Sequence, residues 1–390
     1  MRLAVALGAP VGRALHYGGR VMEAFSRLIL RLHPFVTLAI SGGCFLSTSV
    51  SGLSGGSATS DAGSAVGAEA GHDAVSIADA DGGPIGSPDD GATDAAPQAP
   101  LFELPVVLAP AQFSPRSLAL DADDVVWMNT AKASAAIARA TRRPAGTQGS
   151  ALTVYAGAVL NDGIGLVLTP GGVFWSCITG EHSVCTAAKT GATFNVVSTE
   201  SSGVGKWASG VAYGATLYLA SSTGIASIPT DLSAPAVKLE PSVVTFPVAD
   251  ASSLYFLQGS QVSRMAKAGS PSVIDVVAGA QVGVRGLVLD ASRLYWVVDS
   301  GNVLAIDKGA SAGAPLVLAS GQSGPSSVAI DSGYVYWANA ADGTIARVAK
   351  GGGPVVTIAQ GQVAPSQLVA DDAGLAWVNA NGDVVGMRRK

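Results

Sequence analysis

Short apolar runs separated by turn residues recur along residues 101–390. In one stretch the runs are bounded by Asp331-Ser332-Gly333, Ala341-Asp342-Gly343 and a Lys-Gly-Gly-Gly segment at 350–353. The runs are rich in β-branched, aromatic and aliphatic residues, as strands are, and no segment shows the 3.6-residue period of a helix. Four strands are predicted in this stretch, at Ser327–Ile330, Tyr334–Ala338, Thr344–Val348 and Pro354–Ile358.

This four-strand unit is repeated seven times. Each copy has a hydrophobic pair in its second predicted strand, and the second members of these pairs are 48, 44, 37, 40, 41 and 40 residues apart: Trp127, Trp175, Leu219, Phe256, Trp296, Trp337 and Trp377. A turn position lies six residues before each of them, at Asp121, Thr169, Tyr213, Asp250, Asp290, Asp331 and Asp371. Four strands at a period near 40 residues are typical of a propeller blade. The sequence therefore predicts an all-β, seven-bladed β-propeller with four-stranded blades.

The two ends of the repeat region are predicted to share one blade. The seventh copy reaches Arg388 just after its third strand, and Leu104–Gln112 resembles the fourth strands within 314–322 and 353–362. We therefore expect residues 104–110 to form the fourth strand of the last blade. Such closure hydrogen-bonds the two ends of the region in one sheet and removes exposed sheet edges.

The aromatic pairs also carry a family resemblance. Tyr295-Trp296-Val297-Val298-Asp299 and Tyr336-Trp337-Ala338-Asn339 resemble the Tyr-Trp-Thr-Asp repeats of lipoprotein-receptor propellers and the related NHL repeats, and residues 101–390 look like the propeller lipoproteins of myxobacteria. The resemblance implies a rigid ring for binding or scaffolding. It transfers no functional residue by position, because the copies lack the Thr-Asp half of the motif, and propellers host many unrelated functions.

The N-terminal 43 residues are predicted to be a signal peptide. Basic residues precede an apolar stretch, Pro34–Ile40, which is too short to span a membrane, and small residues lead to Cys44. This ending resembles a bacterial lipobox, in which the cysteine is lipidated. Ser41 stands where lipoboxes prefer Leu, so secretion without a lipid stays open. Translation from Met22 would give a signal of more usual length.

Residues 44–100 are predicted to be a disordered linker. From Phe45 to Pro100 the chain is mainly Ser, Gly, Ala, Asp and Pro, with almost no large apolar side chain to bury. Eight acidic and no basic residues lie in 45–100, whereas 101–390 hold 18 basic and 19 acidic residues. The one cluster of basic residues in 101–390 is Arg388–Lys390. Nucleic-acid binding, which needs many clustered cations, is not expected.

Catalytic chemistry has few candidate residues. Of the four histidines, only His182 falls in the repeat region, so no histidine-based triad or metal cage is predicted, and no cofactor or metal. Virginiamycin-lyase-type propellers depend on His and acidic groups near the channel. Lactonase-type propellers carry acidic residues and Asn on their inner strands. The predicted first strands here instead hold Ser or Gly followed by aliphatic residues, as in Ser117–Leu120, Gly286–Leu289 and Ser327–Ile330. An enzyme is not expected, and a lyase- or lactonase-like activity is the weaker alternative.

The two cysteines of the repeat region are predicted to form a disulfide. Cys177 and Cys185 fall on facing strands of one hairpin, and their spacing matches no usual zinc motif. In an exported protein such a pair is oxidised.

Three residue columns have structural interpretations. We expect the Asp column to start tight turns. We expect the Gln column to satisfy backbone groups where blades join, although a polar ring over the channel is an alternative. We expect the Lys column to be solvated. The Gln column is Gln112, Gln281, Gln322 and Gln362, and the Lys column is Lys189, Lys267, Lys308 and Lys350.

One tryptophan lies outside the aromatic column. Trp207 falls in a predicted loop over 201–209 and is the candidate ligand contact. The tryptophans of the column are expected in the core.

The predicted function is therefore an exported, lipid-anchored binding module. Its ligand is unidentified and is expected to be a protein or glycan of the cell envelope, and the chain is expected to be a monomer that meets the membrane only through its lipid. The predicted location is the outer membrane or cell surface, or otherwise the periplasm or medium. A scaffold or assembly component of the envelope is the alternative; a hollow with exposed aromatics over the channel favours binding, and a flat polar face favours a scaffold.

Overall fold

The computed structural model describes residues 101–130, 135–142, 151–156, 165–178, 182–191, 194–198, 207–240, 242–267 and 274–390. The chain separates into two units, Met1–Asp90 and Gly91–Lys390, and every described residue belongs to the second. The predicted signal peptide, Cys44 and the predicted linker all lie outside the described residues.

Four strands make up each blade, and the blades are numbered here in chain order. Blade 1 has β2 (Pro115–Leu120), β3 (Asp124–Asn129), β4 (Ala136–Thr141) and β5 (Leu152–Ala156), and blade 2 has β6 (Leu166–Thr169), β7 (Gly172–Ile178), β8 (His182–Ala187) and β9 (Phe194–Ser198). Blade 3 has β10 (Trp207–Tyr213), β11 (Thr216–Ser221), β12 (Gly224–Pro229) and β13 (Val237–Glu240), and blade 4 has β14 (Val244–Ala249), β15 (Ser253–Gln258), β16 (Gln261–Ala266) and β17 (Ile274–Ala278). Blade 5 has β18 (Val284–Leu289), β19 (Arg293–Val298), β20 (Asn302–Asp307) and β21 (Leu316–Ala319), and blade 6 has β22 (Pro325–Ile330), β23 (Tyr334–Asn339), β24 (Thr344–Ala349) and β25 (Val356–Ala359). Blade 7 has β26 (Ser366–Asp371), β27 (Gly374–Val378), β28 (Val384–Arg388) and β1 (Val106–Ala109).

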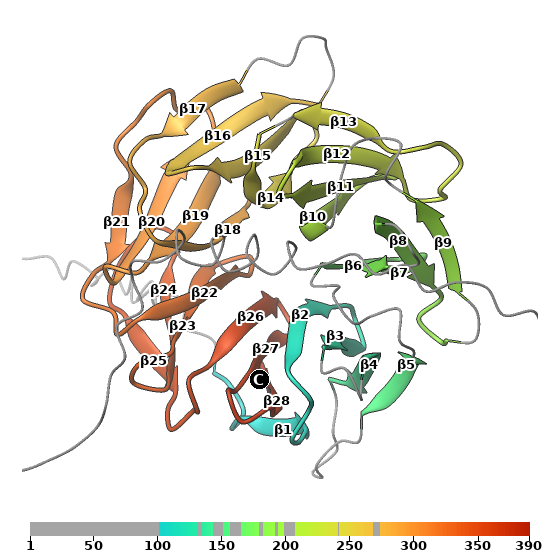
Figure 1. Cartoon of the computed structure of the whole chain (residues 1–390). Coiled ribbons are helices and arrows are strands. Elements are labelled where there is room, and N and C mark those ends of the chain that lie inside the picture. Colours follow the sequence, from blue (N-terminus) through green and yellow to red (C-terminus); the bar gives the residue numbers. More distant parts are fainter. Residues whose placement is uncertain are drawn as a thin grey trace, which may run out of the picture. The chain divides into compact units, whose positions relative to one another are not determined.

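These strands form seven antiparallel four-stranded sheets arranged around one axis (Figure 1). The first strand of each blade lies nearest the axis, and the fourth lies at the rim. The described residues contain no helix. The predicted all-β, seven-bladed propeller is confirmed, and the four strands expected in blade 6 agree with the observed ones to within two residues.

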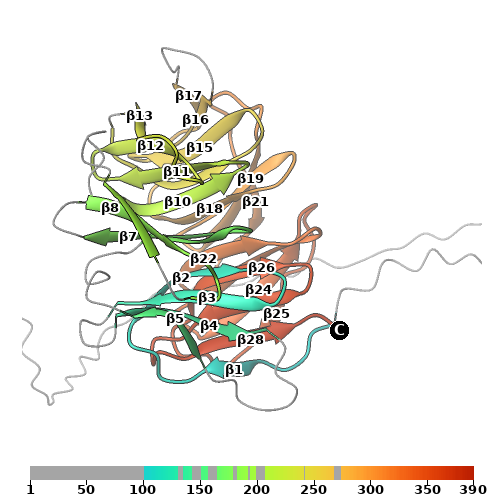
Figure 2. The same ribbon diagram turned by 90° about the vertical axis from the view of Figure 1, so that its right-hand side faces the viewer.

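The predicted closure is also confirmed. Strand β1 pairs antiparallel with β28, with Val106 opposite Gly386 and Val107 opposite Val385 (Figure 2). Beyond the strand, Phe102 forms an isolated bridge with Arg389, so the two ends of the propeller are hydrogen-bonded in blade 7. Leu108 is buried as part of this joint.

Seven hydrophobic clusters fill the spaces between adjacent blades in the described residues. Each contains residues of two neighbouring blades and one member of the aromatic column, as Trp337 does between blades 5 and 6. Every member of that column is fully buried. The column is therefore the core of the propeller, as its spacing predicts.

The Gln column satisfies buried polar groups at the blade junctions. In Gln322, Nε2 donates to the carbonyl of Ser320 at 3.0 Å, and Oε1 accepts the indole N–H of Trp337 at 2.8 Å. Gln281 and Gln362 make the same two contacts with their own blades. The structural interpretation is confirmed, and the bond to the indole is a feature that the sequence analysis missed.

The Asp column does more than start turns. Oδ1 of Asp250 accepts the backbone N–H groups of Ser252 and Ser253, as expected for such a turn. Its Oδ2 lies 2.7 Å from Nζ of Lys308, which belongs to the next blade. This contact between blades, called the clasp below, recurs as Asp121 with Lys189, Asp290 with Lys350, Asp331 with Arg389 and Asp371 with Arg142.

The expectation that the Lys column is solvated is therefore wrong. Lys189, Lys308 and Lys350 are clasp cations, and Lys267 lies 3.5 Å from the ring centre of Tyr213, which replaces Asp in blade 3. Sequence spacing alone hides this pairing, because the partners are separated by a whole blade. At the junction of blades 2 and 3 the corresponding residues are the uncharged Thr169 and Thr230.

Removal of β1 should destabilise the whole ring. Deleting residues 101–112 takes away the strand that pairs with β28 and leaves that edge open, so we expect aggregation or a fall of roughly 10 °C in the thermal midpoint, corresponding to a few kcal/mol. Deleting residues 45–100, which are predicted to be disordered, is the control and should change the midpoint little. Equal melting curves for the first deletion and the full chain would contradict ring closure through β1.

The clasps should make stability depend on acid pH. Partial burial alone would raise the pKa of Asp250, but hydrogen bonds from Lys308 and from two backbone N–H groups outweigh it and hold that pKa well below the ordinary value of about 3.9. A carboxyl group with a lowered folded-state pKa contributes stability above pH ~4 and loses it as the pH falls toward the folded value. Asp250→Asn, which keeps an oxygen for the turn, should therefore show a smaller drop in thermal midpoint between pH 5 and pH 2.5.

The control for this prediction is Asp275→Asn, which removes a carboxylate from an exposed ion pair with Arg264 on the rim. At pH 7, Lys308→Met should lower the free energy of unfolding by about 1 kcal/mol, because the pair is partly shielded from water. A pH profile of Asp250→Asn that matches the wild type would show that the clasp has no such role.

Candidate functional site: the mouth of the central channel

The inner strands β2, β6, β10, β14, β18, β22 and β26 surround a central channel with two distinct ends. Because the strands of each blade are antiparallel, the loops that lead into the inner strands lie on one face of the ring, called the loop face, and the turns that follow them lie on the other, called the turn face. The Gln column belongs to the loop face and the clasps to the turn face. Both ends of the propeller lie on the turn face, since the backbone N–H of Arg389 donates to Ala373 in the β26–β27 turn and that of Lys390 donates to Leu101.

A polar hollow of about 250 Å³ opens at the loop-face end of the channel. This hollow, called the mouth, is lined by residues at the beginning of the inner strands. Its polar members are Ser209, Arg285, Ser326, Ser327 and Gln367, and Phe246 adds an aromatic ring.

The backbone at the mouth is strained. Ser117, Phe246 and Gln367 have φ values of 55°, 53° and 54°, in the left-handed region that non-glycine residues avoid. All three lie where the pairing of the inner strand with its neighbour shifts register, as in a β-bulge. Each such conformation costs about 1–3 kcal/mol, and bulges and strain of this kind concentrate at functional sites.

Hydrogen bonds between neighbouring inner strands hold the mouth in shape. The backbone N–H of Ser117 donates to Oε1 of Gln367 at 3.1 Å, and the backbone N–H of Leu368 donates to Oγ of Ser327 at 3.0 Å. Ser326 donates its hydroxyl to the carbonyl of Pro365 at 2.6 Å. These bonds link blades 6, 7 and 1 around the axis.

One cation lies at the mouth. Nε and Nη2 of Arg285 are 2.5 and 3.0 Å from the carboxylate oxygens of Asp299. Hydrogen bonding to Asp299 and its charge raise the pKa of Arg285, so the guanidinium is cationic at every physiological pH. Both side chains are about half exposed, so solvent screens this pair.

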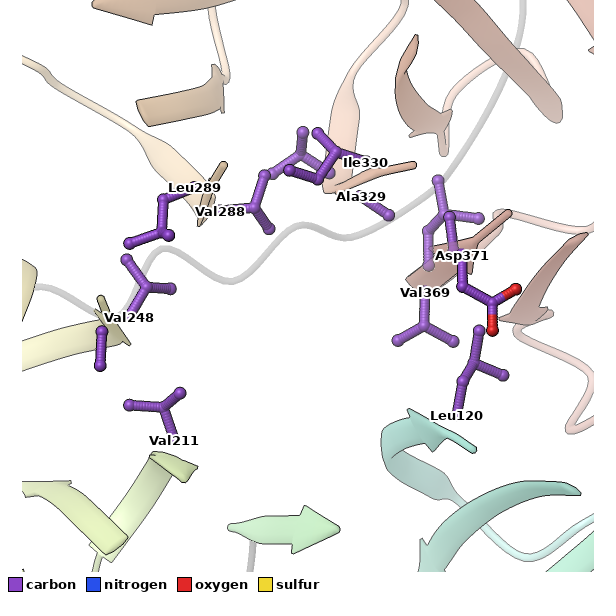
Figure 3. Close-up of a pocket in the computed structure, with 13 residues that line it drawn as sticks. Leu120, Val211, Val248, Val288, Leu289, Ala329, Ile330, Val369 and Asp371 are labelled. Atoms are coloured by element: carbon purple, nitrogen blue, oxygen red, sulfur yellow. The ribbon is translucent and has the colours of Figure 1, made fainter. Parts of the chain in front are cut away.

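The channel becomes apolar toward the turn face. A second cavity of about 460 Å³ is lined by aliphatic side chains of six blades, with Asp371 as its one charged lining residue. Figure 3 shows Val211, Val248 and Val369 directed toward the central space from different strands. Asp371 is already engaged, since both of its carboxylate oxygens bond Arg142 in the clasp.

Exposed apolar side chains also lie on the loop face. Phe113, Val243, Val282 and Val363 lie in four of the loops that lead into inner strands, and their exposed fractions are 59%, 57%, 78% and 49%. They are called the apolar rim below. The sequence analysis associated a binding module with exposed aromatics over the channel, and Phe113 is the one aromatic residue among these four.

The predicted disulfide is present. Sγ of Cys177 and Sγ of Cys185 are bonded, with the two Cα atoms 5.9 Å apart on the adjacent strands β7 and β8. Both residues are buried between blades 1 and 2. Neither cysteine lines the mouth, and the bond has a structural role in the core.

Trp207 lies elsewhere than predicted. It is the first residue of β10 rather than part of a loop, and its exposed fraction is 0%. Its indole packs with Leu219 between blades 2 and 3, and a Cβ on Gly165 would come within 2.2 Å of it. Leu219 is smaller than the aromatic residues at this position in other blades, and the indole fills the space. A ligand contact through Trp207 stays a prediction, while the structure describes a packing role.

Metal-binding clusters and membrane-spanning helices are both absent from the described part of the chain. It holds no group of three or more His, Cys, Asp or Glu side chains placed to bind a metal ion. It also holds no helix of the length and apolarity needed to cross a membrane.

The sequence analysis missed the mouth residues, although the repeat contains a signal for them. Counting ten residues back from each member of the aromatic column gives Ser117, Gly165, Ser209, Phe246, Gly286, Ser327 and Gln367. The three positions that follow in each copy are almost all aliphatic. Of this column, Ser209, Phe246, Gly286, Ser327 and Gln367 line the mouth, and all but Phe246 are polar or small.

Comparisons with known proteins agree on the fold. No protein-family model and no curated protein sequence matches the chain. Among solved structures, virginiamycin B lyase from Staphylococcus aureus superimposes with a TM-score of 0.58 at 10% identity, over 74% of this chain and 99% of that one. YCF48 bound to a D1 peptide gives 0.57 at 11% identity, over 75% and 96%. A streptogramin B lyase gives 0.54 at 12% identity, over 74% and 97%. At these identities the likeness shows the propeller fold, and the resemblance to propeller lipoproteins stays a prediction.

Proposed function

We propose that this chain is an exported, lipid-anchored β-propeller that binds a ligand of the cell envelope at the mouth and apolar rim. The observation that carries the proposal is the strain at Phe246 and Gln367, which both line the mouth, and at Ser117, which precedes the lining residue Leu118. A conformation that costs free energy at several positions of one site is explained by a role other than stability. The hollow and the exposed Phe113 favour binding over an envelope scaffold, for which a flat polar face is expected.

The ends of the propeller are consistent with presentation of this site. Leu101 lies beside Lys390 on the turn face, so the chain enters the propeller on the face opposite the mouth. Lipidation at Cys44 would hold the protein at a membrane. The disulfide supports a location outside the cytoplasm, where such bonds persist.

Binding accounts for the mouth better than catalysis does. One solved neighbour is a virginiamycin B lyase made inactive by replacement of a histidine with alanine and bound to quinupristin. The residues that line the two channel cavities of this chain include no histidine, and their one carboxylate, Asp371, is held by Arg142. Another neighbour is bound to a peptide. These side chains therefore support ligand binding, which needs no proton-transfer group.

Blocking the mouth should abolish binding. Envelope extract, separated into small-molecule, glycan and protein fractions, should raise the thermal midpoint of the full chain, since a ligand at 100 times its Kd adds about 2.7 kcal/mol. Ser209→Trp places a bulky side chain at the mouth and should remove the rise. Ser252→Trp, the same change in an exposed turn on the turn face, is the matched control and should leave the rise unchanged. No rise with any fraction, or an equal rise in Ser209→Trp, would contradict the proposal.

Anchoring should depend on Cys44. The mature wild-type protein should partition into detergent and carry the mass of a lipidated N-terminal cysteine, because multiple acyl chains hold a protein on a membrane far better than one. Cys44→Ala should move the protein to the soluble fraction or stall its processing. A wild-type protein that is fully soluble and begins at another residue would overturn lipidation and leave export standing.

A further inference from the structure

The two channel cavities form one path with polar and apolar ends. The mouth and the apolar cavity share Val328, Leu368 and Val369 as lining residues, so a ligand of sufficient length occupies both. The apolar part offers aliphatic contacts from six of the seven blades (Figure 3). Burial of aliphatic groups in such a cavity is favourable by about 0.8 kcal/mol per methylene. An extended aliphatic chain matches the apolar part.

The hydrogen-bonding groups at the mouth define the other end of the ligand. Oε1 of Gln367 accepts from Ser117 and Oγ of Ser327 accepts from Leu368, which fixes the orientation of both side chains. What remains is the amide Nε2 of Gln367 and the hydroxyl hydrogen of Ser327, both donors, for which the described residues supply no acceptor. The two side chains lie on neighbouring inner strands, since Ser327 bonds the residue that follows Gln367. A ligand group with two acceptor oxygens complements them.

The charges along the channel determine which end of the ligand lies at the mouth. The one charged residue that lines the apolar cavity is Asp371, whose carboxylate is paired with Arg142, so no cation of the described part of the chain lines the turn-face end of the channel. At the mouth, Nε and Nη2 of Arg285 bond Asp299 whereas Nη1 has no acceptor among the described residues. An anionic group is therefore favoured at the mouth and not at the turn face.

We propose that the channel binds an unbranched aliphatic carboxylate, with its carboxylate on Gln367 Nε2 and the Ser327 hydroxyl and its chain in the apolar cavity. This rests on the proposed function and names the ligand class of the same site. It also assigns a use to the strain at Gln367, because the left-handed conformation at the bulge places this amide at the mouth while Ser117 holds its oxygen.

Calorimetric titration of the full chain with hexanoate, octanoate, decanoate and decan-1-ol tests the proposal. Affinity for the carboxylates should rise about fourfold per methylene until the chain fills the cavity. Gln367→Glu keeps an oxygen for the Ser117 N–H but removes the amide donors and adds a negative charge. It should lower the affinity for decanoate about 10- to 150-fold, the usual range for losing a hydrogen bond to a charged group, and leave that for decan-1-ol within about threefold. Gln261→Glu, the same change at an exposed position on β16, is the matched control and should alter neither affinity.

A second variant keeps the test decisive if Gln367→Glu does not fold. Val369→Phe narrows the apolar cavity and should weaken decanoate and decan-1-ol alike. Equal affinities for decanoate and decan-1-ol, both insensitive to Gln367→Glu, would overturn the assignment of the carboxylate. Absence of binding by every aliphatic probe, together with a thermal rise from an envelope fraction that Ser209→Trp removes, would overturn the ligand class and leave the binding function intact. Absence of both would overturn the two proposals together.

Discussion

A four-stranded blade has two apolar faces that it cannot bury alone, and the whole structure depends on each blade burying them against its neighbours. The seven clusters between blades carry out this burial, each around one member of the aromatic column. In an open array the first and last faces would remain in water. The pairing of β1 with β28 makes blade 7 complete, so that the last cluster forms between blades 7 and 1. Closure is thus a condition for the core.

Closure of seven blades also produces the channel. Neighbouring inner strands contact one another, but strands on opposite sides of the axis do not, so side chains of the inner strands face a shared space. The chemistry of that space is decided by three or four positions per blade, which are repeated at a constant offset from the core aromatic. Polar residues such as Ser327 and Gln367 at the first position and aliphatic residues at the next ones make the channel polar at the loop face and apolar at the turn face. The aliphatic lining residues belong to the clusters between blades or pack against them, whereas Ser327 and Gln367 lie outside the clusters.

The sequence predicts what repeats within one blade and misses what joins different blades. The strand count, the blade count, the closing strand and the buried tryptophans all follow from local patterns and a constant period. The clasp of Asp250 with Lys308 does not, because its partners are 58 residues apart and each looks like an ordinary turn residue by itself. The strain at Gln367 likewise depends on a register shift between β26 and β27 that only the structure shows. The sequence analysis placed Trp207 in a loop because this residue does not follow the repeat of its own blade. Its side chain instead packs in the core between blades 2 and 3.

The junction of blades 2 and 3 shows how one fold tolerates an irregular repeat. Thr169 and Thr230 provide no ion pair there, and Leu219 fills less volume than the aromatic residue of other blades. Trp207 supplies the missing volume, and Gly165 leaves the space that its ring needs. In the adjoining blade the bond between Cys177 and Cys185 links β7 to β8, which for so short a loop contributes about 2–3 kcal/mol by restricting the unfolded chain. A substitution at this junction therefore acts on several compensating parts at once, and Gly165→Ala should disturb the ring more than the loss of any single clasp, because its new methyl group displaces a buried indole.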